Sequence, residues 1–252
     1  MIRKVEAKLI RFFHSICYSI VWLIHFLIFS PFIKVKMSGL ENFPKHGRYI
    51  LAGNHQNFCD GFLLTYYLGP LKKVNFIIAK RALKTRFYRF LARAMGSVLI
   101  GNEIEEYQRA LKKLNRILAH GGIVGIFPEG DISSHTKPRR FKPGVAKLSI
   151  DSKVPVIPIY LNGTYNLRFF SYWLKRPEIE IKIGNPVHLY DFATKFGNNL
   201  DQMASVLREN VISLIDTKDF NSSTVYESSI NEVLAKAQET SKPKMMLENI
   251  AQ

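Results

Sequence analysis

A histidine and an aspartate lie five positions apart in the segment Asn54 to Asp60, which follows the apolar run Tyr49–Ala52. A carboxylate that accepts a hydrogen bond from one imidazole nitrogen fixes the tautomer of the ring and leaves the other nitrogen free to take a proton near neutral pH. Because residues five apart point away from each other on a helix, His55 must lie on the loop that precedes the helix. The pair predicts a general base, His55, that is oriented by Asp60. This is a serine triad without its serine, so the nucleophile is expected to be a hydroxyl of the substrate.

Two other interpretations of this segment stay open. Cys59 stands beside Asp60 and could act with His55 to form a covalent acyl-enzyme, although a free cysteine is also a common core residue. A histidine taken alone is more often a structural group that is hydrogen-bonded within the fold. A second motif is therefore needed to favour catalysis.

That second motif is FPEG at residues 127–130, which ends the apolar run Ile123–Ile126. Ligands of open α/β sheets bind at the carboxyl ends of the strands, so the motif and His55 are expected at one rim. Proline restricts the backbone and glycine permits a tight turn, which favours Glu129 as a ligand of the acceptor's hydroxyl groups and Gly130 as the residue that shapes the turn. The alternative is that the motif simply ends a strand and that Glu129 is a solvated turn residue.

From residue 48 onward, short apolar runs alternate with longer amphipathic stretches, as the βα units of a parallel sheet do. Most of the runs are apolar at successive positions, which is typical of strands that are buried on both faces. We therefore predict an α/β fold with a largely parallel, mixed sheet that is flanked by helices on both faces. The predicted strands are Arg48–Ala52, Val74–Ala79, Ser97–Ile100, Gly122–Phe127, Val156–Leu161 and Glu178–Ile183.

Three helices are predicted from residue spacing. The stretch Glu103–Ala119 has apolar residues three or four apart, with acidic residues at its start and basic residues near its end. Two more helices are expected at Gln202–Ile215 and Thr224–Gln238. The stretch Phe87–Met95 interleaves aromatic and aliphatic residues with arginines, and it is interpreted either as a segment that lies on anionic lipid or as an ordinary surface helix.

The N-terminal stretch Phe12–Phe29 is almost wholly apolar, with basic residues on both sides. A secretory signal would need a small-residue cleavage site after the apolar region, and bulky residues follow instead. The stretch is marginal in length for a spanning helix, so we predict a membrane-associated helix in one leaflet, at residues 1–37. The alternative is a hydrophobic helix buried in the domain. A catalytic domain is then expected at residues 38–200 and a C-terminal helical extension at residues 201–252.

The chain of 252 residues carries a formal net charge of +16. Such an excess attracts an acidic partner, which can be anionic lipid, a phosphorylated or CoA-bearing substrate, or nucleic acid. The two cysteines, Cys17 and Cys59, cannot build a disulfide framework or a four-ligand zinc site. The sequence has no glycine-rich loop of the GxxxxGK or GxGxxG kind, which argues against nucleotide hydrolysis.

The segments NHQNFCD, FPEG and VPVIPIY occur in this order, and together they resemble the glycerolipid acyltransferase family typified by 1-acyl-sn-glycerol-3-phosphate acyltransferase, over residues 38–190. The family motif NHxxxxD places its histidine and aspartate on His55 and Asp60. The family's fourth motif, an apolar strand with two prolines, matches Val154–Ile159. The resemblance implies acyl-CoA or acyl carrier protein as the donor, a lysolipid or glycerol phosphate as the acceptor, and no metal or prosthetic group.

Two sites depart from the family's pattern. Asn102 stands where the second motif of the family ends in an arginine thought to hold the acceptor phosphate, and Asp131 and Ile132 follow FPEG where threonine and arginine are common. Other cations are then candidates for the phosphate, since arginine grips phosphate through two parallel hydrogen bonds and lysine binds it as a point charge. The candidate substrate-binding cations are Lys80, Arg81, Arg139, Arg140 and Lys142.

The sequence thus predicts an O-acyltransferase that moves a fatty acyl group to the hydroxyl of a lysophospholipid, with 1-acyl-sn-glycerol-3-phosphate favoured as acceptor and phosphatidic acid as product. It is expected to work at the cytoplasmic face of a membrane, with the bilayer as a partner and without nucleic acid. One alternative is transfer to another lysophospholipid, a glycolipid or a polyol. The other is a non-catalytic basic protein that binds membranes or nucleic acid.

Overall fold

The structure, a computed structural model, describes residues 31–215 apart from 45–46, 70–71, 134, 136, 169–173 and 197–198, and also residues 12, 16, 18–20, 22–24 and 26–27. The helix predicted at Thr224–Gln238 and much of the segment predicted at residues 1–37 lie outside the described residues. Between Phe12 and Leu27, the described residues are helical.

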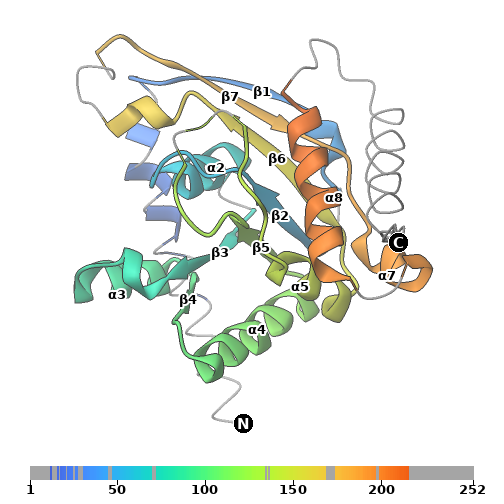
Figure 1. Cartoon of the computed structure of the whole chain (residues 1–252). Coiled ribbons are helices and arrows are strands. Elements are labelled where there is room, and N and C mark those ends of the chain that lie inside the picture. Colours follow the sequence, from blue (N-terminus) through green and yellow to red (C-terminus); the bar gives the residue numbers. More distant parts are fainter. Residues whose placement is uncertain are drawn as a thin grey trace, which may run out of the picture.

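Seven strands form one sheet in the described part of the chain: β1 (Lys34–Ser38), β2 (Tyr49–Gly53), β3 (Val74–Ala79), β4 (Val98–Ile100), β5 (Ile123–Ile126), β6 (Val156–Asn162) and β7 (Glu178–Ile183). Their order across the sheet is β1-β7-β6-β2-β5-β3-β4 (Figure 1). β7 runs antiparallel to β6, β1 runs parallel to β7, and the other neighbours are parallel. This confirms a largely parallel, mixed sheet. The carboxyl ends of β2, β3 and β5 consequently share one rim.

Helices cover both faces of this sheet. They are α2 (Asp60–Leu68), α3 (Arg86–Ala94), α4 (Ile104–Ala119), α5 (Gly144–Ser152), α7 (Leu189–Phe196) and α8 (Leu200–Ser213), with short 3-10 turns η1 (Leu40–Asn42), η2 (Lys80–Ala82) and η3 (Tyr165–Arg168).

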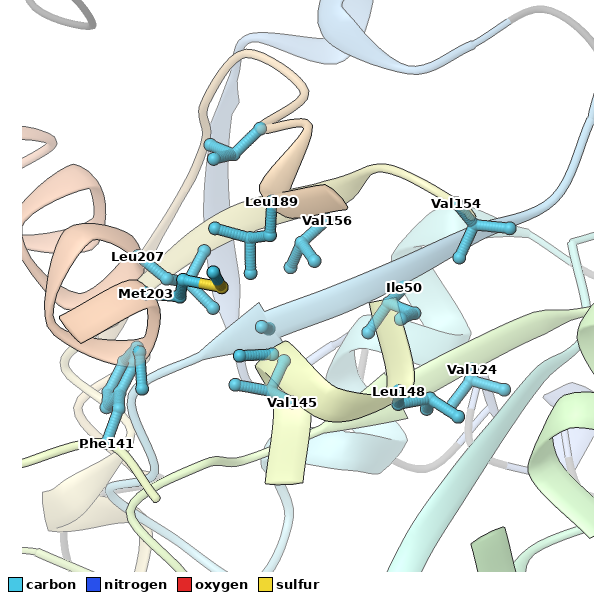
Figure 2. Close-up of a cluster of buried hydrophobic side chains, with 14 of the residues drawn as sticks. Ile50, Val124, Phe141, Val145, Leu148, Val154, Val156, Leu189, Met203 and Leu207 are labelled. Atoms are coloured by element: carbon cyan, nitrogen blue, oxygen red, sulfur yellow. The ribbon is translucent and has the colours of Figure 1, made fainter. Parts of the chain in front are cut away.

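Side chains of β2 alternate between two buried clusters, because successive residues of a strand face opposite sides of the sheet. Ile50 and Ala52 join a cluster with α4, α5 and α8. Figure 2 shows part of it, with side chains of α5 and α8 gathered around Ile50 and Val156. Tyr49 and Leu51 join the cluster on the opposite face, which contains α2. Every residue of β2 is buried, so the strand that leads to the His55 loop is held from both sides.

The structure confirms each predicted strand, and two of the predicted helices, to within two residues at either end. It adds β1, whose residues 34–37 were predicted to belong to the N-terminal segment. It also packs α8 into the core through buried Met203, Leu207 and Val211, although the sequence placed this helix in a C-terminal extension.

Described residues of the N-terminal stretch contact α2 and the loop after it. The Trp22 indole N–H donates to the carbonyl oxygen of Tyr66 at 3.0 Å, and the two rings stack. The Tyr18 hydroxyl donates to the carbonyl oxygen of Lys72 at 3.3 Å. Along the same stretch, large apolar side chains such as Phe12 and Leu27 are exposed. Among the described residues, none of the helices has both the length and the apolar character needed to cross a membrane.

Gly125 of β5 is expected to be essential for packing, because a Cβ at this position would collide with the Phe76 ring. Gly125→Ala should lower the free energy of unfolding by about 1–3 kcal/mol, as overpacked core substitutions do. Gly61→Ala is the matched control, since its Cβ would meet the same ring at an ordinary 3.7 Å. Denaturant unfolding of both variants measures the difference, and equal stability of the two would contradict the steric argument.

Candidate active site

His55 and Asp60 form a hydrogen-bonded pair at the carboxyl end of β2. His55 Nδ1 lies 2.9 Å from Asp60 Oδ2. The histidine stands on the loop between β2 and α2, and Asp60 is the first residue of α2. The Asp60 side chain is fully buried, whereas 19% of the His55 side chain is exposed. Because Nδ1 faces the carboxylate, Nε2 is the ring nitrogen left for a substrate.

The carboxylate of Asp60 is oriented by the backbone of the same loop. Its Oδ2 also accepts hydrogen bonds from the backbone N–H groups of Gln56, at 2.7 Å, and Asn57, at 2.9 Å. The N-terminus of a helix carries a partial positive charge that favours a carboxylate there. These contacts fix Oδ2 toward His55 Nδ1 and so select the tautomer with its proton on Nδ1.

Two aromatic rings stack in series on one face of the His55 imidazole. Phe127 of the FPEG motif stacks on His55 with ring centroids 4.2 Å apart and an interplanar angle of 6°. Phe76 of β3 stacks on Phe127 in turn, at 5.7 Å. The rings restrict the plane of the imidazole, while the Asp60 contact restricts its rotation. The sequence pointed to Phe127 only as a member of a motif, and Phe76 was not singled out.

Glu129 bridges the two loops at the rim. Its Oε1 accepts a hydrogen bond from the backbone N–H of His55 at 3.0 Å. Its Oε2 accepts from the backbone N–H of Arg139 at 3.1 Å and from Arg139 Nε at 3.3 Å. Only 1% of the Glu129 side chain is exposed. Both carboxylate oxygens are thus engaged within the protein, so the geometry favours a role in positioning His55 over the predicted contact with an acceptor.

A second contact ties the same two loops together. The carbonyl oxygen of His55 accepts a hydrogen bond from the backbone N–H of Ser133 at 2.7 Å. The backbone of His55 is therefore held on its N–H side by Glu129 and on its carbonyl side by Ser133. The loop after β5 thus fixes the backbone position of the loop that carries His55.

Gly130 closes the tight turn of the FPEG motif. Its backbone N–H donates to the carbonyl oxygen of Phe127 at 3.0 Å, and its φ of +77° is one that glycine adopts without a steric penalty. A Cβ on Gly130 would also collide with the ammonium group of Lys142. Lys142 is exposed and lies against this turn, so it remains a candidate for binding an anionic group at the rim.

Arg81 also reaches the rim, from η2 at the end of β3. Its Nη2 lies 2.9 Å from Asp131 Oδ2 and 3.3 Å from the carbonyl oxygen of Gly130. Both side chains of the Arg81–Asp131 pair are exposed. Arg81, one of the cations predicted to bind phosphate, is thus paired with Asp131, the acidic residue that departs from the family pattern.

Three other predicted substrate-binding cations have partners within the protein. The Nη2 of Arg139 donates to the carbonyl oxygens of residues 131 and 132, besides the contact of this side chain with Glu129. Arg140 pairs with Asp201 of α8 at 2.8 Å. Lys80 forms an ion pair with Glu106 of α4, and this hydrogen bond holds the pKa of the Glu106 carboxyl below its usual range. The structure does not bring Arg140 into contact with the His55 loop.

Two asparagines that were not predicted as site residues, Asn54 and Asn57, fix the His55 loop to β6 and to the turn after it. The buried Asn54 amide donates to the carbonyl oxygen of Leu161 and accepts from its N–H, both at 2.8 Å. Asn57 Nδ2 donates to the carbonyl oxygen of Thr164 at 3.0 Å. The signal available in the sequence was an amide placed directly after a wholly apolar strand.

Cys59 directly precedes Asp60 in the chain, and its environment disfavours a role as a nucleophile. Burial raises the pKa of its thiol to about 11, and the Asp60 carboxylate adds to the rise. A thiol with a pKa this high is protonated at neutral pH, and the thiolate is the reactive form. Across the described residues, no cluster of three His, Cys, Asp or Glu side chains is arranged as a metal site.

We therefore expect Cys59→Ala to keep acyl transfer within about twofold of the parent rate, since a protonated thiol contributes little nucleophilicity. The measurement is release of the thiol product, with the rate of a Cys17→Ala variant as the control. Near-complete loss of acyl transfer in Cys59→Ala, with the Cys17→Ala variant still active, would instead support a covalent acyl-enzyme on Cys59.

The sequence of this chain is similar to those of known acyltransferases. A model of the acyltransferase family matches residues 34–162. A 1-acyl-sn-glycerol-3-phosphate acyltransferase of Borreliella burgdorferi is 24% identical over 191 residues, which cover 73% of this chain and 73% of the relative. One from Chlamydomonas reinhardtii is 29% identical over 201 residues, covering 77% of this chain and 57% of that protein.

A solved structure has the same fold. The crystal structure of the 1-acyl-sn-glycerophosphate acyltransferase from Thermotoga maritima matches with a TM-score of 0.60 at 22% identity, covering 85% of both chains. This likeness supports the α/β architecture described above. The family match includes the loops that carry His55 and Glu129 and the start of α2 with Asp60.

Proposed function

Because the chain belongs to the acyltransferase family, we propose that it transfers a fatty acyl group to the free hydroxyl of 1-acyl-sn-glycerol-3-phosphate and so makes phosphatidic acid. The observation that carries the proposal is the contact between His55 Nδ1 and Asp60 Oδ2 at 2.9 Å, next to a partly exposed imidazole. This geometry suits a general base whose nucleophile comes with the substrate.

The proposed reaction begins when the acceptor hydroxyl donates its proton to His55 Nε2 while its oxygen attacks the thioester carbonyl carbon. An imidazolium forms, and the Asp60 carboxylate stabilises it without taking the proton. The carbon–sulfur bond of the tetrahedral intermediate then breaks. His55 returns its proton to the departing thiolate, which leaves as the free thiol, and the ester is complete.

Donor and location extend the same proposal. Acyl-CoA or an acyl carrier protein is the donor, and the chemistry requires no metal or prosthetic group because the base and its orienting acid are side chains of the chain. The lipid acceptor is drawn from a bilayer, at the cytoplasmic face where such donors are found. The net charge of +16 supports both an anionic lipid surface and an anionic donor.

A positioning role for Glu129 predicts a kinetic signature. Glu129→Gln replaces one acceptor oxygen by an NH2 group that faces N–H donors, so we expect kcat to fall by about 10–100-fold, as misplacement of a catalytic group by roughly 1 Å does. The acceptor KM should change little. Steady-state kinetics test this, with Glu105→Gln on the exposed side of α4 as a control. A raised KM with unchanged kcat would instead assign Glu129 to acceptor binding.

The Arg81–Asp131 pair favours one alternative acceptor class. Asp131 neutralises Arg81, an exposed cation beside the FPEG turn, and Asn102 offers no charge in place of the arginine common in the family. A phosphodiester acceptor with a cationic headgroup would satisfy both members of the pair, with its phosphate on Arg81 and its ammonium on Asp131.

Acyl transfer from labelled acyl-CoA to a panel of acceptors tests the function. Lysophosphatidic acid is compared with lysophosphatidylethanolamine and lysophosphatidylcholine, using detergent-solubilised protein. Preference for lysophosphatidic acid supports the proposed reaction. Preference for a headgroup-bearing acceptor that Asp131→Asn abolishes supports the alternative. Transfer to none of them contradicts both.

A further inference from the structure

The segment between Asp60 and Glu103 contains no acidic residue. It includes η2, α3 and the turns on either side of α3, so the segment itself contributes only positive formal charge, and acids from other segments pair with Lys80 and Arg81 of η2. A surface of one sign attracts an extended partner of the opposite sign. Its basic residues are Lys72, Lys73, Lys80, Arg81, Lys84, Arg86, Arg89 and Arg93.

α3 combines this charge with exposed aromatic side chains. Phe87 is 67% exposed and Phe90 is 62% exposed. Residues three apart lie on one side of a helix, so the two rings share a face. Arg86 and Arg93 are exposed around them, while Ala92 faces the protein. This arrangement of apolar rings flanked by arginines is typical of helices that lie in a membrane interface.

The position of α3 connects this face with the active site. Figure 1 shows α3 at the periphery of the molecule, beside β3 and β4. The helix follows η2, which begins where β3 ends at the catalytic rim. Exposed Phe58 stands on the His55 loop after β2, and exposed Ile132 stands on the loop after β5. Since β2, β5 and β3 are neighbours in the sheet, exposed apolar residues follow three adjacent strand ends.

We propose that α3 docks on an anionic lipid bilayer, inserting Phe87 and Phe90 below the headgroups while Arg86 and Arg93 contact lipid phosphates. This contact turns the rim with His55 toward the lipid surface, and it deepens the proposed function by naming the face that meets the membrane. The headgroup region is where amphipathic basic helices bury their apolar side.

A bilayer fits this face better than a nucleic acid does. Aromatic side chains that bind single strands line a groove in which successive bases stack. Here the rings are exposed on a peripheral helix (Figure 1) that also carries exposed arginines, which suits a planar surface with an apolar interior.

Site-specific fluorescence tests insertion directly. The full chain carries Cys17→Ser and Cys59→Ala together with Phe90→Cys, labelled with an environment-sensitive dye. We expect a blue shift, and quenching by brominated acyl chains, when vesicles of phosphatidylglycerol and phosphatidylcholine are added. The control is Leu40→Cys on η1, which is exposed but lies at the opposite edge of the sheet. A dye at position 90 that stays in water, or that responds to single-stranded RNA instead, overturns the proposal.

Partitioning of unlabelled variants gives a second readout. Phe87→Ser with Phe90→Ser should lower the partition coefficient on these vesicles about tenfold, whereas Leu40→Ser leaves it unchanged. Replacing Arg86 and Arg93 by glutamine should weaken binding more than replacing Lys112 and Lys113 of α4, which removes the same charge. Docking through α3 is contradicted if the serine variants of α3 and η1 bind vesicles equally well. It is also contradicted if the arginine and lysine replacements weaken binding to the same extent.

The two proposals fail in different ways. The aromatic double variant should lose acyl transfer to a long-chain lysolipid held in vesicles but keep transfer to a short-chain, water-soluble acceptor. Vesicle binding through α3 without acyl transfer by the parent protein contradicts the proposed function alone. Full transfer by the double variant to vesicle-held acceptor contradicts docking alone.

Discussion

His55→Ala is expected to lower the rate of acyl transfer by about 10³-fold, since general base catalysis contributes roughly 10²–10⁴ and the variant has no imidazole to accept the proton of the acceptor hydroxyl. The imidazole lies on the surface of the Phe127 ring and is partly exposed, so its removal leaves the buried core unchanged. Release of the thiol product from acyl-CoA measures the rate, and circular dichroism measures the fold.

The matched control is His120→Ala, at the end of α4, where the imidazole is exposed and its Nδ1 lies 2.7 Å from the carbonyl oxygen of Arg116. We expect the parent rate from this variant. A folded His55→Ala protein that transfers acyl groups at the parent rate would contradict the catalytic assignment. Retained vesicle binding with lost transfer separates catalysis from a protein that only binds membranes.

Asp60→Asn is expected to reduce turnover by about 10³-fold as well, through the tautomer of His55. An amide NH2 placed at the Oδ2 position would donate to Nδ1 and move the ring proton to Nε2, where the acceptor hydroxyl needs a free lone pair. The same group would face the backbone N–H donors of Gln56 and Asn57. The variant should therefore also lose stability, by roughly 1–3 kcal/mol for unsatisfied buried donors.

Kinetics and thermal unfolding measured together distinguish these two effects of Asp60→Asn. Ser149→Ala, which removes a hydroxyl bonded to the carbonyl oxygen of Val154 in the core, provides a variant destabilised away from the site. It should unfold earlier yet keep its turnover at a temperature where it is folded. An Asp60→Asn protein with the parent kcat would exclude Asp60 as the group that orients His55.

The fold was predictable from sequence where strands are buried on both faces. β2 and residues 156–161 of β6 are continuous apolar runs because these residues are buried between two layers, and such runs stand out from the amphipathic helices between them. β1 escaped prediction because it is an edge strand whose Lys34 and Lys36 face water. Its pairing with β7, from the far end of the chain, is not a local property of the segment.

The candidate site divides in a similar way. His55 and Asp60 are close in sequence, so their contact followed from a loop and a helix start. The partners of Glu129 are a backbone N–H on another strand's loop and Arg139 in its own loop, and only tertiary structure brings them together. From the sequence, the Glu129 carboxylate in its turn was therefore predicted to bind the substrate. Burial, which sequence spacing does not reveal, favours a different role.

The hydrogen bonds from Asn54 to Leu161 and from Asn57 to Thr164 each join residues 107 positions apart. Their consequence concerns the order of events during protein synthesis. A ribosome adds about 5–20 residues per second, so several seconds separate the emergence of the His55 loop from that of its partners on β6 and the turn after it. A nascent chain that has exposed β2 and α2 but not β6 still lacks the contacts that shape this loop. Catalytic competence is thus acquired late in translation, once the middle of the sheet has closed.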